Sequence, residues 1–159
     1  SMEDIVVSDA VLDTQQGRIT IFHLPDLPGN CSRIFQAVAA AGIVVDMIVG
    51  NPSEPGRAQT SFSAPIQDLQ RALEATQAVV KTIDPQASAA ADPNIARLIV
   101  SGIGMRTHTG VARRMFGALA ERGINIAMIN TSEIRVSVVV DRARGQEALE
   151  ALKGAFNLT

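Results

Sequence analysis

The stretches GNCSRIFQAVAAAGIVVDMI (residues 29–48) and GVARRMFGALAERGINIAMI (residues 110–129) decide the fold of this chain. They lie 81 positions apart, and nine of their 20 aligned pairs are identical, where chance would supply roughly one or two. The identical pairs are Gly29/Gly110, Arg33/Arg114, Phe35/Phe116, Ala37/Ala118, Ala39/Ala120, Gly42/Gly123, Ile43/Ile124, Met47/Met128 and Ile48/Ile129. We therefore predict a duplicated unit of about 75 residues.

Each copy contains one predicted amphipathic helix followed by a glycine. The apolar side chains recur at the spacing of a single buried helix face, namely Cys31, Ile34, Phe35 and Val38 in the first copy and Ala112, Met115, Phe116 and Leu119 in the second. Gly42 and Gly123 stand where a helix ends on a residue with positive φ. On this buried face Cys31 is expected to be a small core residue and not a nucleophile.

Strands and a second helix are predicted around each amphipathic helix. The expected strands are 18–24, 44–49 and 58–64 in the first copy and 96–102, 125–130 and 134–140 in the second, and the closing helices are 66–82 and 142–156. This β-α-β-β-α order predicts an α+β fold of the ferredoxin-like βαββαβ type, with helices on one face of an antiparallel sheet.

The fold requires one more strand at the end of each unit. Residues 86–91 take this place in the first unit, although a run of Ala and Ser is a poor strand former. The second unit has no strand left before Thr159, whereas the apolar residues 5–12 have no place in the first unit. We therefore expect this N-terminal strand to complete the second sheet, which nests the first unit inside the second. The predicted organisation is a tag remnant at 1–2, the strand segment at 3–13, and tandem units at 17–91 and 94–159.

Composition and charge exclude several classes of partner. The 159 residues carry a net charge of -2 and include five Phe but no Trp or Tyr, so the basic surface and stacking rings of a nucleic-acid binder are missing. No apolar run approaches the ~20 residues of a membrane span. With 47% hydrophobic residues, the chain is expected to be a globular cytoplasmic protein that binds neither nucleic acid nor membranes.

No metal or nucleotide cofactor is expected either. Cys31 is the only cysteine, which excludes an internal disulfide and a multi-cysteine zinc site. His23 and His108 are isolated, without further ligands at metal-binding spacing. Gly102-Ile-Gly104 lacks the third glycine and the later acidic residue of a dinucleotide fingerprint.

The loop Asp26-Leu27-Pro28-Gly29 joins the first predicted strand to its helix. Pro28 and Gly29 favour a turn that leaves the first N–H groups of the helix unpaired and pointing outward. Such a helix start attracts a carboxylate, and the neighbouring Asp26 side chain attracts an ammonium. An α-amino acid carries both groups, so the loop is a candidate binding site for one. The alternative is that Asp26 only caps the helix, since Asp is a preferred N-cap residue.

The pattern Asp26-x-Pro28-Gly29 between a strand and a helix, within a duplicated βαββα unit, resembles ACT domains, the small-molecule sensing modules of amino-acid metabolism. Four further stretches are similar to the regulatory region of aspartate kinase. They are DMIV (46–49), GIGMRTHTGVA (102–112), GINIAMI (123–129) and TSEI (131–134). The likeness covers residues 5–156 and agrees with the nested, tandem arrangement of that family.

This resemblance implies a threonine site between the first ACT unit of one chain and the second unit of another. Asp26 would bind the ammonium or hydroxyl group of the effector, and backbone groups of Gly29, Cys31 and Ile126 would bind its carboxylate and amine. The residues that match this site are Asp26, Gly29, Cys31, Gly50, Asn125 and Ile126. The family often has Gln where Gly50 stands, so one polar contact of about 0.5–1.5 kcal/mol is expected to be missing here.

The resemblance also implies a second, lysine-type site. Its matching residues are Met105, His108, Gly110, Val111, Ala112, Ser132 and Glu133. Glu133 is the expected partner of an effector ammonium, unless it is only an exposed carboxylate on a strand. His108 is expected to shape the loop and not to catalyse. Thr109 replaces a proline that is usual in the family, which predicts a less rigid loop.

The resemblance implies a regulatory chain without catalytic residues. The family's catalytic kinase domain is far larger than the few residues before residue 5, so no ATP site is expected. The chain resembles either the separately made β subunit of a two-subunit aspartokinase or a cloned regulatory fragment. The implied partners are a second copy of the chain, forming a homodimer, and the catalytic kinase domain or α subunit.

The implied function is allosteric feedback inhibition of the aspartate-family amino-acid pathway by threonine and/or lysine. Two alternatives remain open on the sequence alone. One is a structural dimerisation module without a ligand response, and the other is a stand-alone amino-acid sensor that serves another enzyme. Titration with threonine and lysine separates the first alternative from an effector-binding protein.

Overall fold

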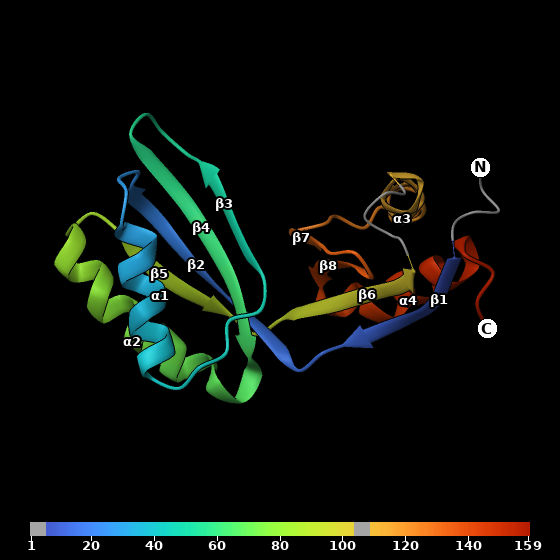
Figure 1. Cartoon of the computed structure of the whole chain (residues 1–159), viewed down its shortest axis with the longest axis horizontal. Helices are drawn as coiled ribbons and strands as arrows, with labels where there is room; N and C mark the ends of the chain where they lie inside the picture. The colour runs from blue at the N-terminus through green and yellow to red at the C-terminus, as the bar shows by residue number, and fades with distance from the viewer. Residues whose placement is uncertain (1–5, 104–108) are drawn as a thin grey trace. The chain divides into compact units, whose positions relative to one another are not determined.

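The structure is a computed structural model that describes residues 6–103 and 109–159. The expected tag remnant at 1–2 and two residues of the lysine-type set, Met105 and His108, lie outside the described residues. The chain forms two compact units (Figure 1). We call Gln15–Pro93 the inserted unit, and Ser1–Thr14 with Asn94–Thr159 the split unit.

The inserted unit is built on a four-stranded antiparallel sheet with the order β3-β4-β2-β5. Its strands are β2 (Gln16–Pro25), β3 (Ile48–Pro52), β4 (Arg57–Pro65) and β5 (Ser88–Asp92). The long central strands β2 and β4 pair from Gln16↔Pro65 to Pro25↔Arg57. The Ala/Ser segment predicted as the closing strand does pair with β2, so the poor intrinsic preference of these residues is overridden by the sheet.

Two helices cover one face of this sheet (Figure 1). They are α1 (Asn30–Ala40) and α2 (Leu69–Ile83), the second preceded by a 3-10 turn, η2 (Ile66–Asp68). Apolar residues of both helices and of the two central strands form one core. Within it the rings of Phe35 and Phe62 meet edge to face, with centroids 5.4 Å apart.

The split unit repeats this architecture with the sheet order β1-β6-β8-β7. Its elements are β1 (Val6–Asp13), β6 (Ile95–Ile103), α3 (Thr109–Glu121), β7 (Met128–Thr131), β8 (Arg135–Asp141), η4 (Arg142–Arg144) and α4 (Gly145–Ala155). Strand β1 pairs antiparallel with β6 from Val6↔Ile103 to Asp13↔Arg97. The predicted α+β fold and the nesting of one unit inside the other are therefore confirmed.

The buried faces of the first helices agree with the prediction except at their first residue. Cys31 is exposed, so its expected place in the core is wrong. The buried rows are Asn30, Ile34 and Val38 in α1 and Val111, Met115 and Leu119 in α3. Each row has a spacing of four and begins one residue earlier than predicted. Cys31 lies about 60° around the helix from Ile34, and Ala112 the same angle from Met115, so both stand at the edge of the buried row.

The predicted helix ends are confirmed. Gly42 and Gly123 have φ angles of 78° and 67°. The N–H of Ile43 donates to the carbonyl of Val38 at 3.3 Å, and the N–H of Ile124 to that of Leu119 at 3.0 Å. These bonds satisfy carbonyl groups that the end of a helix otherwise leaves unpaired.

The strands after these helices begin later than predicted, at Ile48 and Met128. In the inserted unit the hydroxyl of Ser63 accepts the N–H of Met47 at 3.1 Å, in place of a ladder carbonyl. Regular pairing starts at Ile48↔Phe62, and before it the N–H of Ser63 donates to the carbonyl of Met47 at 3.0 Å. No helix among the described residues is long and apolar enough to cross a membrane.

Candidate functional site

The β2–α1 loop, residues 26–29, carries three of the predicted threonine-site residues on or beside it. The backbone N–H of Asp26 donates to the carbonyl of Gly56 at 2.9 Å, and the Asp26 side chain is exposed. Gly29, with a φ of 92°, is the N-cap of α1, and no side chain bonds to the cap. The alternative in which Asp26 caps this helix is therefore wrong, because a left-handed glycine takes that place.

The first turn of α1 combines unpaired backbone N–H groups with one buried, hydrogen-bonded side chain. Asn30 is buried, and its side-chain amide donates to the carbonyl of Pro25 at 2.8 Å, which joins the two ends of the loop. The N–H groups of Cys31 and Ser32 find no acceptor among the described residues. The exposed carboxylate of Asp26 and two unpaired N–H groups therefore belong to one short, anchored segment.

Gly50 lies on the edge strand β3, opposite Thr60, and not on the loop. A Cβ atom added at Gly50 would meet only the Oγ1 of Thr60, at 3.8 Å. The position therefore has room for a side chain, and its glycine is not required by packing.

The remaining threonine-site residues belong to the split unit. Asn125 is exposed and Ile126 is half-buried against the core, between α3 and β7. The structure thus places Asp26, Gly29 and Cys31 together on the inserted unit, and divides the full set between the two units.

The described members of the lysine-type set all lie on the split unit. Gly110, Val111 and Ala112 form the start of α3, but the Val111 side chain is fully buried, so only its backbone can face a ligand. Ser132 and Glu133 are exposed in the turn between β7 and β8. The N–H of Ser132 donates to the carbonyl of Arg135 at 2.8 Å, which closes this turn.

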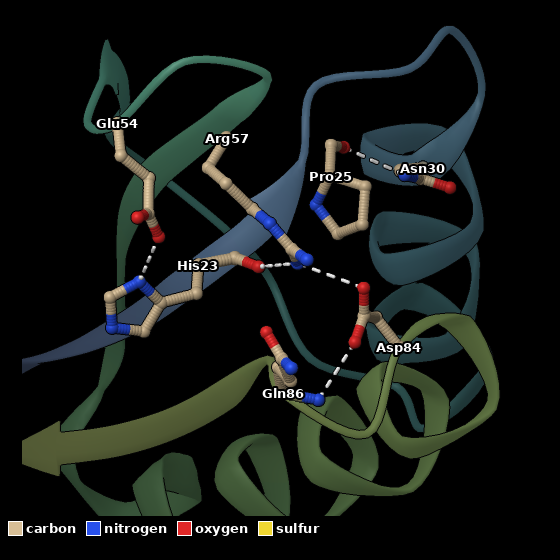
Figure 2. A network of polar contacts seen from close by, with 7 residues as sticks. All are labelled: His23, Pro25, Asn30, Glu54, Arg57, Asp84 and Gln86. Carbon is tan, nitrogen blue, oxygen red and sulfur yellow. Dashed lines mark hydrogen bonds and ion pairs between the residues drawn. The ribbon is translucent and has the colours of Figure 1, made fainter.

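A polar network that the sequence motifs did not single out lies next to the β2–α1 loop (Figure 2). The Nη1 of Arg57 donates to the carbonyl of His23 and to the Oδ2 of Asp84, each at 2.8 Å. The Oδ1 of Asp84 accepts the N–H of Gln86 at 2.7 Å. The Nδ1 of His23 lies 3.0 Å from the Oε1 of Glu54.

The network keeps Asp84 ionised. The N–H of Gln86 is the largest influence and lowers the pKa of Asp84 below its ordinary value of 3.8; partial burial opposes this, and Arg57 lowers the pKa further. At neutral pH the Arg57–Asp84 contact is therefore a charge-assisted hydrogen bond between two mostly covered side chains.

Two hollows lie away from the predicted site residues. One, of about 190 Å³, is lined by residues of α2 and of the segment leading into β5, including Gln77 and Lys81. The other, of about 300 Å³, lies between α3 and α4, with Ala118 and Gly154 in its lining. Among the described residues no group of three or more His, Cys, Asp or Glu is arranged to hold a metal ion.

Comparisons with known proteins match both the fold and the sequence. Residues 98–156 match the ACT domain family. The regulatory subunit of aspartate kinase from Thermus thermophilus, in a ligand-free form, superimposes with a TM-score of 0.90 and 37% identity, over 96% of this chain and 99% of that one. A chain from a structure of aspartokinase alpha and beta subunits gives a TM-score of 0.86 and 40% identity, with the same two coverages.

Longer proteins contain the same region. The aspartokinase of Pseudomonas aeruginosa is 40% identical over 158 residues, which are 99% of this chain and 38% of the relative. The aspartokinase of Thermus thermophilus is 38% identical over 157 residues, again 38% of its length. The chain thus spans well under half of the curated relatives that it matches.

Proposed function

The chain belongs to the ACT-domain regulatory subunits of aspartate kinase, and from this premise we propose that it binds an amino-acid effector, threonine and/or lysine. Binding would exert feedback control on aspartate kinase and so on the synthesis of aspartate-family amino acids. The catalysis, an ATP-dependent transfer of phosphate to the side-chain carboxylate of aspartate, is proposed to belong to a catalytic kinase domain or α subunit.

The observation that carries the proposal is the chemistry of the β2–α1 loop. An exposed carboxylate, Asp26, and the unpaired N–H groups of Cys31 and Ser32 stand within seven consecutive residues. The carboxylate of an amino acid matches the N–H groups at the helix start, and its ammonium matches the carboxylate of Asp26. No cofactor is needed for this binding.

The roles follow from the position of each group. Asp26 is proposed to bind the ammonium or hydroxyl of threonine, and the backbone at Gly29 and Cys31 its carboxylate. Asn125 and Ile126, from the split unit of a second copy, are proposed to complete the site, which makes the effector a ligand of a homodimer. The lysine-type set would supply a second site, with Glu133 as partner of the ammonium.

A structural dimerisation module without a ligand response is the second candidate. The observation that favours it is Gly50, which leaves open space where the family often has the amide of Gln. One lost neutral hydrogen bond costs about 0.5–1.5 kcal/mol, which weakens an effector site without abolishing it. The remaining alternative, a stand-alone sensor, differs from both candidates in the enzyme that it would regulate.

Calorimetric titration of the whole chain with threonine, lysine and valine tests the proposal. Valine is the matched control, because it has the shape of threonine without the hydroxyl. We expect threonine to bind, and Gly50→Gln to tighten binding by roughly two- to tenfold. If neither threonine nor lysine gives heat or raises the melting temperature, in wild type and in Gly50→Gln alike, the dimerisation module is the better description.

A further inference from the structure

Strand β2 is irregular just before the β2–α1 loop. The register between β2 and β4 shifts between Ile21 and Leu24, which marks a β-bulge. His23 lies in this bulge with a φ of 57°, in the left-handed region that a non-glycine residue rarely adopts. A bulge re-aims the chain that follows it. The direction in which Pro25 enters the loop therefore depends on how the bulge is held.

Arg57 holds the bulge from the side. Its Nη1 donates to the carbonyl of His23 at 2.8 Å, and the same atom donates to the Oδ2 of Asp84 at 2.8 Å (Figure 2). The side chains of Arg57 and Asp84 are only 24% and 19% exposed. A contact this well covered loses less to solvent screening than an exposed ion pair does.

The backbone around Arg57 holds the loop itself. Pro25 is opposite Arg57 in the sheet, and the N–H of Asp26 donates to the carbonyl of Gly56 at 2.9 Å. The N–H of Arg57 donates to the carbonyl of Glu54 at 2.9 Å, and Glu54 in turn contacts the His23 ring. Residues 54–57 form the turn that bonds to Asp26. This turn is held by the backbone of Arg57 and by the contact of Glu54 with His23 in the bulge.

Asp84 anchors the other end of this arrangement. It follows the last residue of α2, Ile83, and its own backbone is extended, with a φ of -159°. Its N–H donates to the carbonyl of Val80, and its carboxylate accepts the N–H of Gln86. Asp84 is therefore held by the turn between α2 and β5, and it gives the Arg57 guanidinium a fixed point.

We propose that Arg57 is a positioning residue of the effector site: by joining the β2 bulge to the end of α2 through Asp84, it holds the loop at Asp26 in its binding geometry without touching the effector. The effect of Arg57 on effector binding rests on the proposed function. The ordering of the loop by Arg57 is independent of it.

The experiment compares the Arg–Asp pairs of the two units in the full chain. Arg57→Met keeps the aliphatic stem and removes the donors, Arg57→Lys keeps the charge, and Arg97→Met is the matched control. Arg97 pairs with Asp13 at 2.6 Å in the split unit, with side chains 14% and 19% exposed. Two readouts are taken, namely amide exchange at Asp26 without ligand and the threonine Kd.

Arg57→Met is expected to speed exchange at Asp26 by roughly tenfold or more and to weaken threonine binding by about the same factor. Arg57→Lys should recover part of both effects, and Arg97→Met should change neither. A purely structural role would lower the melting temperature and leave the Kd of the folded protein unchanged. Unchanged exchange at Asp26 in Arg57→Met, with a folded inserted unit, would overturn the proposal.

The failure of the proposed function is distinguishable from the failure of this inference. If wild type binds neither threonine nor lysine, the exchange measurement alone decides, and faster exchange at Asp26 supports the positioning role. If Arg57→Met does not fold, Arg57→Gln replaces it, because this shorter, uncharged side chain cannot join the carbonyl of His23 to the carboxylate of Asp84. The same two readings then apply, with the same outcome overturning the inference.

Discussion

The inserted and split units differ clearly at the first residue of their buried helix rows. In α1 this residue is Asn30, 9% exposed, whose amide bonds to the carbonyl of Pro25. In α3 the aligned residue is Val111, 0% exposed and packed in the apolar core. One copy anchors its helix start with a satisfied polar group, and the other anchors it by packing. The polar anchor also joins the start of α1 to the end of β2, through the carbonyl of Pro25.

An identical residue in the two copies shows the same divergence. Arg33 in α1 donates to the Oγ1 of Thr82 at 2.8 Å. Its counterpart Arg114 in α3 donates to the carbonyl of Ala155 at 3.4 Å and lies 5.8 Å from the centroid of the Phe156 ring. Both arginines join the first helix to the end of the second helix of their own unit. The contact between the two helices is thus present in both copies, but the group that the arginine contacts differs.

Deleting residues 3–12 is expected to have the largest effect and to separate the two units. The deletion removes most of the β1–β6 pairing and the buried Ala10, a loss expected to exceed the about 4 kcal/mol that marks exceptional single substitutions. Hydrogen exchange should become fast in β6 and β8 and stay slow in β2 and β4. Equal loss of protection in all four strands would contradict the independence of the units.

Exchanging the two helix-start residues sharpens the comparison. Val111→Asn buries an amide without an arranged partner and is expected to destabilise the split unit by about 3 kcal/mol. Asn30→Val removes one hydrogen bond and is expected to cost the inserted unit only about 1 kcal/mol. Urea unfolding of each variant measures both values. Similar costs would mean that the two anchors are interchangeable.

Asp26→Ala tests the loop of the inserted unit directly. Charge-assisted hydrogen bonds contribute about 1.5–3 kcal/mol, so threonine binding should weaken roughly 10- to 150-fold. The control is Glu74→Ala, which removes an equal charge from the exposed surface of α2. Calorimetry of both variants in one buffer gives the ratio. Equal threonine affinity in the two would remove Asp26 from the site.

The smallest expected effect is a dependence of stability on pH that belongs to the inserted unit. The N–H of Gln86 and the guanidinium of Arg57 lower the pKa of Asp84 below 3.8, so Asp84 contributes its full stabilisation above that pH. The contribution is lost as the pH falls through the lowered pKa. Urea unfolding of wild type and Asp84→Asn should show a stability gap at pH 7 that narrows below pH 3.8. A gap that stays constant would contradict the ionised pair.

Much of the fold could be predicted from local patterns. The repeat located both units, and the surplus strand before Gly17 located the partner of β6. Only the first residue of each buried helix row was missed, because Asn30 and Val111 are buried where Cys31 and Ala112 were predicted, and the polar Asn30 is covered through its bond to the carbonyl of Pro25. The late start of β3 was missed because the contacts before it reach across the chain, as the bond from the N–H of Met47 to the hydroxyl of Ser63 does over 16 positions.

The candidate site was predictable only in its local part. The loop with Asp26 and Gly29 could be recognised, because strand, turn and helix follow one another along the chain. The ties that hold it could not be, since Arg57 reaches Asp84 across 27 positions and the His23 bulge has no sequence signature. The Gly50 departure was visible in the sequence, but its room for a side chain was not.

The pairing of β2 with β5 has a consequence for the order of events during synthesis. These strands pair from Arg18↔Asp92 to Phe22↔Ser88, so the folded inserted unit brings its entry and exit points next to each other. Closing a loop becomes costlier with the logarithm of its length, and Asp13 is 84 residues from Arg97. Once the inserted unit has folded, a short bridge replaces that loop. The inserted unit, which is complete when its last strand has been synthesised, therefore brings β1 close to the place where β6 will pair with it.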